Sequence, residues 1–435
     1  MQEETPPIGP EPGSGQLHRL ADHLFRHEWG KMVAVLTRTF GTENLELAED
    51  VVQDTFLAAF QVWVQQGIPA NPQAWLYRVA RNKALNRIRH NRFSSQHDFS
   101  NPARPLPSHG PALHTFPEEP WEPHRVSDDM LRMMFACCHP GLPEEQQVTL
   151  ILKTLCGFST AEIARAFFCP EDTVSKRLYR GKAFFREHRI RPEIPGPGEL
   201  QQRLEAVLHS VYLLFNEGYN SGQPDRLIRT DLMEEALLLG RLLTAHPETA
   251  QPATFALLAL LCYQYSRSQS RLGADGNIIL LDQQDRSQWN HEWIAAGNEY
   301  MNRAAVGNTV SAYHLQAAIA FEHCSAPDFA QTNWTGIVRY YRWLCRLSPS
   351  PVFELHMAVA VLHAEGTAAA LRILEQMDAP KKMDSYYLYH SLLGEINQRD
   401  GRHEAARQHF EKALALTGSE AEKKMLRAKM ERLCF

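Results

Sequence analysis

Apolar residues recur at three- and four-residue spacings along most of the chain, which is the pattern of amphipathic helices. The stretch Leu47–Trp63 has one apolar stripe, made by Val52, Phe56, Ala59 and Trp63. Alternation typical of strands is nearly absent, and the best strand candidate is the short run Asn277–Leu281. We therefore expect an all-α fold.

Three proline-bearing stretches interrupt the helical pattern: Met1–Gly15, Phe93–His124 and Ile190–Gly198. Proline stops a helix and favours extended chain, so we interpret these stretches as a tail and two linkers. They divide the chain into three expected parts, residues 16–92, 125–190 and 199–435.

The composition is that of an ordinary globular protein, with 435 residues of which 44% are hydrophobic and 22% charged. The longest apolar run, Phe255–Tyr263, is far shorter than the roughly 18 residues that a membrane-spanning helix needs. The acidic N-terminus lacks the basic start and apolar core of a secretory signal. We expect a cytoplasmic protein that does not bind membranes.

Positive charge is concentrated locally, although the net charge is −5. Arg78–Arg92 holds six Lys and Arg residues and no acid, and Lys176–Arg189 holds six with one acid. Such patches suit contacts with nucleic acid, but solvated helix faces explain them equally well.

Opposite the apolar stripe of Leu47–Trp63 lie Asp50 and Asp54, with Gln53 beside them and Glu49 nearer the edge of the stripe. A second helix is expected from Asn71, which suits a cap, and Pro72, which suits the first turn. Its core stripe consists of Leu76, Val79, Ala80, Ala84 and Ile88.

The far side of this second helix is basic, with Arg78, Arg81, Arg89 and Arg92 outward and with Lys83 and Arg87 flanking the stripe. Cations that follow the phosphate backbone and rings that stack on unpaired bases are what opened DNA requires. Trp75 and Tyr77 could supply the rings or belong to the core; we favour the core for Trp75 and leave Tyr77 open.

Phe158–Arg189 has the pattern of a helix-turn-helix, in which Thr160 caps the first helix and Pro170 ends it. Acidic residues at Glu171 and Asp172 favour the start of the second helix. We expect Val174, Leu178 and Phe185 to point inward. The residues expected to point largely outward are Ser175, Lys176, Arg177, Tyr179, Arg180 and Lys182. Such a helix can enter the major groove of DNA, although similar helix pairs occur in proteins that bind no DNA.

Taken in order, the motifs LAEDVVQDTFLAAF, AWLYRVARNKALNRIR and FSTAEIARAFFCPEDTVSKRLYRGKAFFR resemble the extracytoplasmic-function (ECF) class of bacterial sigma factors, also called group 4. The resemblance covers about Leu17–Arg189. The rest resembles a subgroup with a long C-terminal extension of tetratricopeptide-like helices. The sequence blocks Asp128–Leu142, Leu213–Ser221 and Leu280–Trp289 carry that likeness.

The resemblance implies roles by position. Residues implied to dock on the clamp of the polymerase's largest subunit are Glu49, Asp50, Gln53 and Asp54. Residues implied to melt and read the −10 element are Trp75, Tyr77, Arg78, Arg81, Asn82, Lys83, Arg87 and Arg89. Residues implied to read the −35 element are Ser175, Lys176, Arg177, Tyr179, Arg180 and Lys182. Asn86 and Phe168 depart from the common family pattern.

Repeats of roughly 34 residues are expected from about residue 325. Leu393 and Gly394, followed by Ala406, Phe410 and Ala413, fit the large and small positions of one repeat. Equivalent places one repeat earlier are taken by Ala358, Ala370, Leu374 and Met377, and before that by Ile337, Tyr341, Leu344 and Pro349. Stacked repeats would form a solenoid that binds a protein or peptide partner; the alternative is an ordinary helical bundle.

Two other motifs invite a chemical interpretation. Asp282, Asp285 and Arg286 could perform acid–base chemistry, but we favour an ion-paired turn that caps a helix starting near Ser287, with Trp289 packed. Cys137, Cys138 and His139 lack the usual zinc spacing, so we expect buried thiols and no metal site. The eight cysteines should be reduced, and we expect no cofactor.

We therefore expect a sigma factor that binds core RNA polymerase and promoter DNA, is not an enzyme, and carries a C-terminal domain that regulates or supports its activity. One alternative is a DNA-binding regulator with a tetratricopeptide sensor domain that is not a polymerase subunit. Another is a hydrolase built around Asp285.

Overall fold

The computed structural model describes residues 14–96, 123–167, 169–221, 227–273, 277–377 and 383–433. Regular structure in these ranges is helical, which confirms the all-α expectation. The expected strand Asn277–Leu281 is wrong: its only sheet-like feature is an isolated antiparallel bridge between Leu272 and Ile278. The segment turns back on itself, with Ile279 N donating to Arg271 O at 2.9 Å, and pairs with no further strand.

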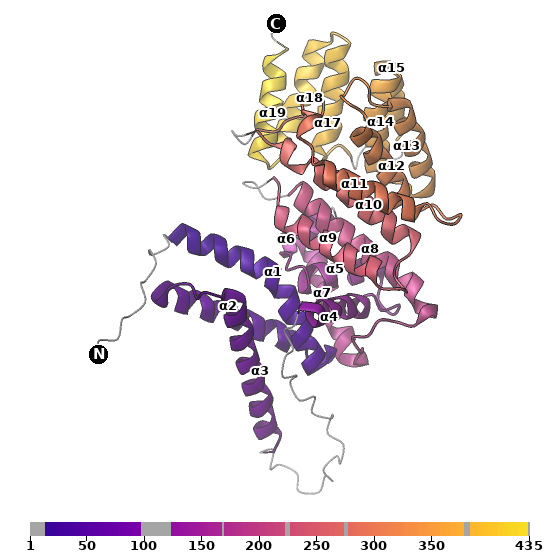
Figure 1. The fold of residues 1–435 in the computed structure, drawn as a ribbon. Coiled ribbons are helices and arrows are strands. Elements are labelled where there is room, and N and C mark those ends of the chain that lie inside the picture. The colour runs from indigo at the N-terminus through magenta and orange to yellow at the C-terminus, as the bar shows by residue number, and fades with distance from the viewer. Residues whose placement is uncertain are drawn as a thin grey trace, which may run out of the picture. The chain divides into compact units, whose positions relative to one another are not determined.

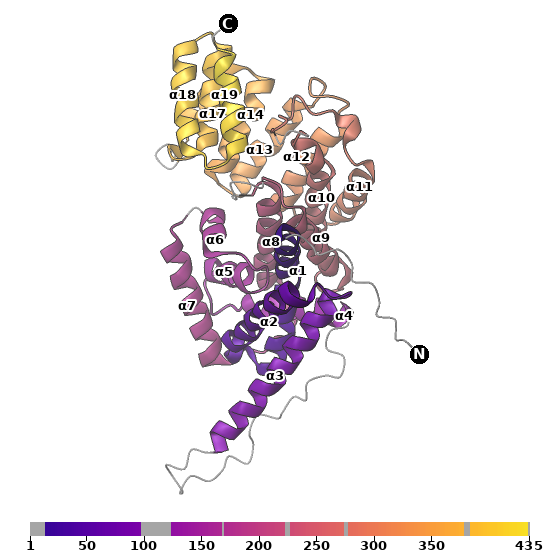
Figure 2. The ribbon, with the colours of Figure 1, turned by 90° about the vertical axis from the view of Figure 1, so that its left-hand side faces the viewer.

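The chain forms two compact units, Met1–Ser210 and Val211–Phe435, and the boundary between them in the sequence falls within helix α8 (Pro197–Tyr219). The first unit contains, besides the start of α8, the helices α1 (Ser14–Phe40), η1 (Thr42–Asn44), α2 (Leu45–Gln66), α3 (Pro72–Gln96), α4 (Pro123–Cys137), α5 (Glu144–Thr154), α6 (Thr160–Ala166) and α7 (Glu171–His188). In both views α3 projects away from α1 and α2 (Figures 1 and 2).

Helix α1 is the centre of the first unit. Its residues from Met32 to Thr37 are buried on every side of the helix, and α1 contacts α2, α3 and α4. At Gly30 an added Cβ would lie 1.6 Å from the carbonyl oxygen of Leu155. The backbone after α5 therefore lies directly against α1, and only glycine leaves room for it.

The helix ends follow local capping rules. As expected, Asn71 caps α3, whose first residue is Pro72; the Asn71 side chain accepts a 3.0 Å hydrogen bond from Ala74 N. The expected cap at Thr160 is wrong by one residue. Ser159 caps α6 through a capping box with Glu162, because the serine side chain and the glutamate side chain each bind the other's backbone N–H.

Most of the expected linker over residues 93–124 lies outside the described residues, as does Phe168. The flanking helices reach into the ends of that linker, since α3 runs on to Gln96 and α4 begins at Pro123. The second linker has no regular secondary structure up to Pro197, where α8 begins.

The second unit continues α8 and adds α9 (Thr230–Ala245), α10 (Pro252–Ser266), η2 (Ser268–Arg271), η3 (Arg286–Gln288), α11 (His291–Ala304), α12 (Ala312–Ser325), α13 (Trp334–Leu347), α14 (Pro351–Ala364), α15 (Thr367–Glu375), α17 (Tyr387–Arg399), α18 (His403–Leu416) and α19 (Glu420–Glu431). Successive helices pack against each other from α12 to α15, and again from α17 to α19. Helices α17, α18 and α19 lie side by side near the C-terminus (Figures 1 and 2).

Small and large positions expected from the repeat pattern are in contact between α17 and α18, whereas Pro349, expected in the same pattern, is exposed. The space beside Gly394 on α17 is filled by the ring of Phe410 on α18, which would lie 2.6 Å from an added Cβ. Ala358, Ala370, Ala406 and Ala413 are fully buried. Small residues therefore let consecutive helices approach closely, and the large ones fill the space between them.

Candidate polymerase and nucleic-acid interface

The outer face of α2 carries the acidic residues that the sequence analysis singled out. Asp50 and Gln53 are exposed, and Asp54 is about half exposed, with a loose 3.8 Å ion pair to Arg87 on α3. The same face continues into exposed Leu57 and Val64, which the sequence analysis did not consider. An acidic surface with neighbouring apolar side chains can bind a basic, partly apolar partner.

Glu49 is placed differently from its neighbours. Its side chain is only 14% exposed, and it pairs with Lys182 of α7 at 2.5 Å. Burial raises the pKa of Glu49, and the charge and hydrogen bond of Lys182 oppose that shift. Its position at the edge of the apolar stripe agrees with this partial burial, but the sequence offers no sign of the partner.

The two aromatic residues at the start of α3 are partly buried, and each contacts another side chain of the protein. The Trp75 ring packs edge-on against Trp63, with ring centroids 5.5 Å apart. The Tyr77 hydroxyl donates a hydrogen bond to the carboxylate of Glu28, which is fully buried. The same carboxylate accepts a 2.8 Å hydrogen bond from the side-chain amide of Gln73. These contacts favour the core interpretation for both rings. Glu28 was missed from the sequence, because its neighbours Arg26, His27 and Lys31 give no sign of burial.

The basic face of α3 is accessible in its middle turns. Arg78, Asn82 and Arg87 are exposed, whereas Arg81 and Lys83 are partly buried. The side chain of Arg89 is not among those that the structure describes. Behind this face, Leu76, Ala80 and Ala84 are fully buried as expected. Val79, expected in the core, and Arg81, expected to point outward, are both partly exposed.

Helix α7 presents one row of accessible polar side chains. Ser175, Lys176, Tyr179 and Arg180 are exposed, and Tyr179 is 69% accessible. Lys176 pairs only with Asp172 of its own helix, at 2.7 Å between two exposed groups, a weak pair that another anion can replace. This row suits phosphate and base contacts.

Two residues of α7 expected to point outward are instead largely covered. The side chain of Arg177 is 16% exposed: it forms an ion pair with Glu145 and lies over the Phe167 ring, 5.3 Å from its centroid. The side chain of Lys182 is 20% exposed in its pair with Glu49. The expected outward orientation is wrong for both, because neighbouring helices supply acids that draw these long side chains inward.

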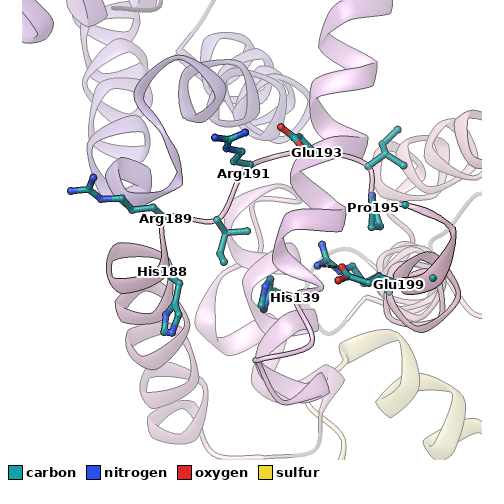
Figure 3. A pocket seen from close by; sticks show the side chains of 12 residues that line it. His139, His188, Arg189, Arg191, Glu193, Pro195 and Glu199 are labelled. Atoms are coloured by element: carbon teal, nitrogen blue, oxygen red, sulfur yellow. Dashed lines mark hydrogen bonds and ion pairs between the residues drawn. The ribbon is translucent and has the colours of Figure 1, made fainter. Parts of the chain in front are cut away.

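A cavity of about 580 Å³ lies where α7 ends and α8 begins (Figure 3). Both signs of charge line it, namely Arg189, Arg191 and Arg203 with Glu193 and Glu199. The side chains of Arg189 and Arg191 point away from Glu199 (Figure 3), and Arg203 pairs with Glu199 at 2.6 Å. The cations therefore do not converge on one point.

The remaining motifs have structural explanations. Cys137 and Cys138 are fully buried, and burial raises the pKa of Cys137 to about 12. Within the described ranges there is no cluster of three potential metal ligands. Asp285 caps the single turn η3, and Trp289 is buried. Arg286 donates to the carbonyl oxygens of His323 and Ala326 at the end of α12, so it bonds backbone there instead of the expected ion pair.

Comparison with known proteins gives matches in two ranges of the first unit. Residues 24–94 match Sigma-70 region 2, and residues 132–185 match Sigma-70, region 4. The ECF RNA polymerase sigma factor SigL of Mycobacterium tuberculosis is 32% identical over 139 residues, which make up 32% of this chain and 72% of that protein. The chain belongs to the ECF sigma factor family.

Other relatives of this sigma factor extend the comparison. The ECF RNA polymerase sigma-E factor of Haemophilus influenzae is 28% identical over 163 residues, 37% of this chain and 82% of that protein. An uncharacterized protein of Rhizobium meliloti is 35% identical over 390 residues, 90% of each chain. That similarity includes the long C-terminal extension, where residues 203–305 match a family of unknown function, DUF6596.

No solved structure matches the chain. Across the described residues, none of the helices combines the length and the apolar character needed to cross a membrane.

Proposed function

We propose that this ECF sigma factor binds core RNA polymerase through the outer face of α2 and directs it to promoters through α3 and α7. As a member of a family of non-catalytic initiation factors, it has a role in transcription initiation. The observation that carries the proposal is the order of the two matched regions, each with an accessible polar helix face: Asp50 and Gln53 on α2, and Lys176, Tyr179 and Arg180 on α7.

The division of labour follows from the chemistry of the faces. Basic side chains along α3 and α7 can neutralise phosphates, and an arginine in the major groove can pair with a guanine edge. The acidic face of α2 would be repelled by DNA and is suited to a basic protein surface. Trp75 and Tyr77 then act mainly by holding α3 in place, and exposed Arg78, Asn82 and Arg87 are the first candidates for DNA contact.

For the extension, we propose a tetratricopeptide-like domain that supports or regulates activity and binds a protein or peptide partner. The close approach of α17 and α18 at Gly394 and the buried small residues of α14, α15 and α18 support it. Sequence similarity to the Rhizobium meliloti protein along 90% of both chains supports a role that needs the extension and the sigma regions in one molecule.

The test is promoter-specific transcription in vitro with purified core RNA polymerase and the full chain. We expect transcripts that start at defined sites only when the protein is added. A protein that binds DNA but gives no specific start with core polymerase would contradict the proposal and favour the regulator alternative. An Asp285→Ala variant with unchanged activity would in turn dispose of the hydrolase alternative.

A further inference from the structure

Helix α13 of the second unit carries two parallel rows of side chains. The basic row consists of Arg339, Arg342 and Arg346. An apolar residue follows each arginine directly in the sequence, and these form the apolar row, Tyr340, Trp343 and Leu347. Both rows have the spacing i, i+3, i+7, so each follows one line along the helix surface. Helix α13 contains no acid that would neutralise the arginines.

The opposite side of α13 fixes the helix in the protein. Ile337, Val338 and Leu344 are buried, and α13 packs against α12 and α14. Tyr340 is partly buried and packs against the same core. The two rows therefore lie on a well-anchored helix, and substitution of their exposed members should leave the core intact.

The apolar row is open to solvent at its other two members. Trp343 is 45% exposed and Leu347 is 46% exposed, and Trp343 is the only exposed tryptophan among the residues that the structure describes. Tryptophan is strongly buried on average in folded proteins. Tryptophan and arginine are also the residues that most often dominate the binding energy of protein interfaces. An exposed tryptophan and leucine one turn apart, beside three arginines, therefore indicate a surface that a partner covers.

The basic row is accessible to carboxylates. Arg339 and Arg346 are exposed, and neither forms an ion pair with a residue that the structure describes. Arg342 pairs with Glu365 at 2.8 Å, and both side chains are about half exposed. Such an open pair is weak, so a carboxylate of a partner can replace Glu365. Guanidinium groups bind carboxylates with two parallel hydrogen bonds, which gives the row a preference for acidic side chains.

We propose that the two rows of α13 bind an acidic amphipathic helix of a partner protein. The proposal rests on the proposed function of the extension, which includes a protein or peptide partner, and it names the surface and the chemistry of that partner. Apolar residues of the partner helix, three or four positions apart, can cover Tyr340, Trp343 and Leu347. Carboxylates along its flank can pair with the arginines.

Single-stranded nucleic acid is the rival occupant of this face. It supplies negative charge, and its bases can stack on the Trp343 ring. Leu347 has no ring on which a base could stack, whereas it suits the aliphatic and aromatic side chains of an amphipathic helix. The chemistry of the apolar row therefore favours a peptide.

The first experiment selects binders without assuming their sequence. A display library of random peptides of about 16 residues, enough for about four helical turns, is panned against the immobilised full chain. We expect the enriched sequences to place Asp or Glu beside apolar residues that recur at spacings of three and four. Fluorescence anisotropy of a labelled enriched peptide should show an affinity that falls as salt is raised, because the arginines are exposed.

Variants of the full chain then locate the binding site. Trp343→Ala with Arg346→Glu should weaken binding of the enriched peptide at least about tenfold. The matched control is Leu416→Ala with Arg427→Glu, which makes the same kinds of change at exposed positions of α18 and α19. The control should bind the peptide like the wild type. Circular dichroism and thermal unfolding check that both double variants are folded.

The other outcomes separate this inference from the proposed function. Enriched peptides without acids, or equal affinities of the two double variants for the peptide, would overturn the α13 face but leave a partner elsewhere on the extension. If no peptide is enriched, the partner-binding part of the proposed function fails as well. A labelled single-stranded DNA of about 20 nucleotides is measured with the same variants. If the α13 variant loses DNA binding and keeps peptide binding, nucleic acid is the occupant and the proposal is wrong.

Discussion

At the scale of single residues, we expect Arg177 of α7 to contribute to stability and Arg180 of the same helix to contribute to DNA binding. Arg177 is covered by Phe167 and Glu145, whereas Arg180 is exposed. We expect Arg177→Ala to lower the free energy of unfolding by about 1–2 kcal/mol, since it removes a stacked, paired cation. Arg180→Ala should cost about 1–3 kcal/mol of DNA affinity at one promoter position.

Fluorescence anisotropy with DNA duplexes that differ in the −35 sequence measures the effect on DNA affinity. Thermal unfolding of the same protein variants measures the effect on stability. Lys176→Ala is the comparison for a phosphate contact: it should weaken binding to all sequences alike and lower the salt slope by about one. An Arg180→Ala protein that loses affinity equally for every −35 variant would contradict the assignment of a base contact.

The acidic face of α2 provides a second test at this scale. We expect Asp50→Lys with Asp54→Lys to weaken binding to core polymerase tenfold or more, because both carboxylates face outward and rim charges act together. Glu187→Lys with Glu205→Lys reverses two exposed acids on α7 and α8 and should leave core binding unchanged. Equal affinities of the two double variants for core polymerase in a pull-down titration would contradict the assignment of α2 to the polymerase interface.

At the scale of helices, close approach between neighbours decides stability in the extension. Gly394→Leu would drive a side chain into the Phe410 ring, since even a Cβ would lie 2.6 Å from it. We expect a loss of at least about 2 kcal/mol in the free energy of unfolding, measured by urea denaturation. Gly418→Leu has open space around it and should change stability little; equal losses would mean that α17 and α18 do not pack as described.

At the scale of the whole molecule, acidification should weaken the second unit. Burial and the nearby Arg267 and Arg286 lower the pKa of His323 to about 3, and burial also lowers the pKa of His363 and His409. A histidine whose pKa is depressed on folding binds fewer protons in the folded state. Its contribution to stability is therefore present above the unfolded pKa of about 6.5 and is lost as pH falls below it.

We expect the melting temperature of the second unit to fall between pH 7 and pH 5, with each such histidine contributing at most about 1.4 kcal/mol per pH unit. Differential scanning calorimetry of the full chain measures this, and His323→Gln should reduce the slope. A melting temperature independent of pH in this range would contradict the burial of these rings.

Truncation of the chain tests whether the C-terminal extension affects transcription, and the structure indicates which truncation point leaves the first unit intact. The early turns of α8 belong to the first unit, where Leu200 and Leu204 are buried and Arg203 donates to Phe135 O at 3.4 Å. A chain cut after Arg189 should therefore unfold more easily, whereas one cut after Ser221 keeps α8. We expect the Ser221 truncation to be folded and to lose promoter-specific transcription, since a tethered domain acts at high effective concentration. Unchanged transcription would contradict both an activating and an inhibitory role.

The helices and most of their buried faces could be predicted from the sequence, because the spacing of apolar residues and the chemistry of caps are local properties. Val52, Ala59 and Trp63 are buried, Asn71 caps α3, and the thiols of Cys137 and Cys138 are inside, all as the pattern predicts. Asp50, Lys176 and Arg180 are exposed for the same reason: each lies opposite an apolar stripe.

Which polar side chains contact each other could not be predicted from the sequence, because it depends on how distant helices pack. Lys182 and Arg177 lie on the polar side of their helix, yet acids of α2 and α5 cover them. Tyr77 meets Glu28 across 49 positions of sequence. Helical periodicity says which side of a helix a residue occupies, but it carries no information on which distant helix packs there. Long charged side chains then turn toward whichever partner that packing supplies.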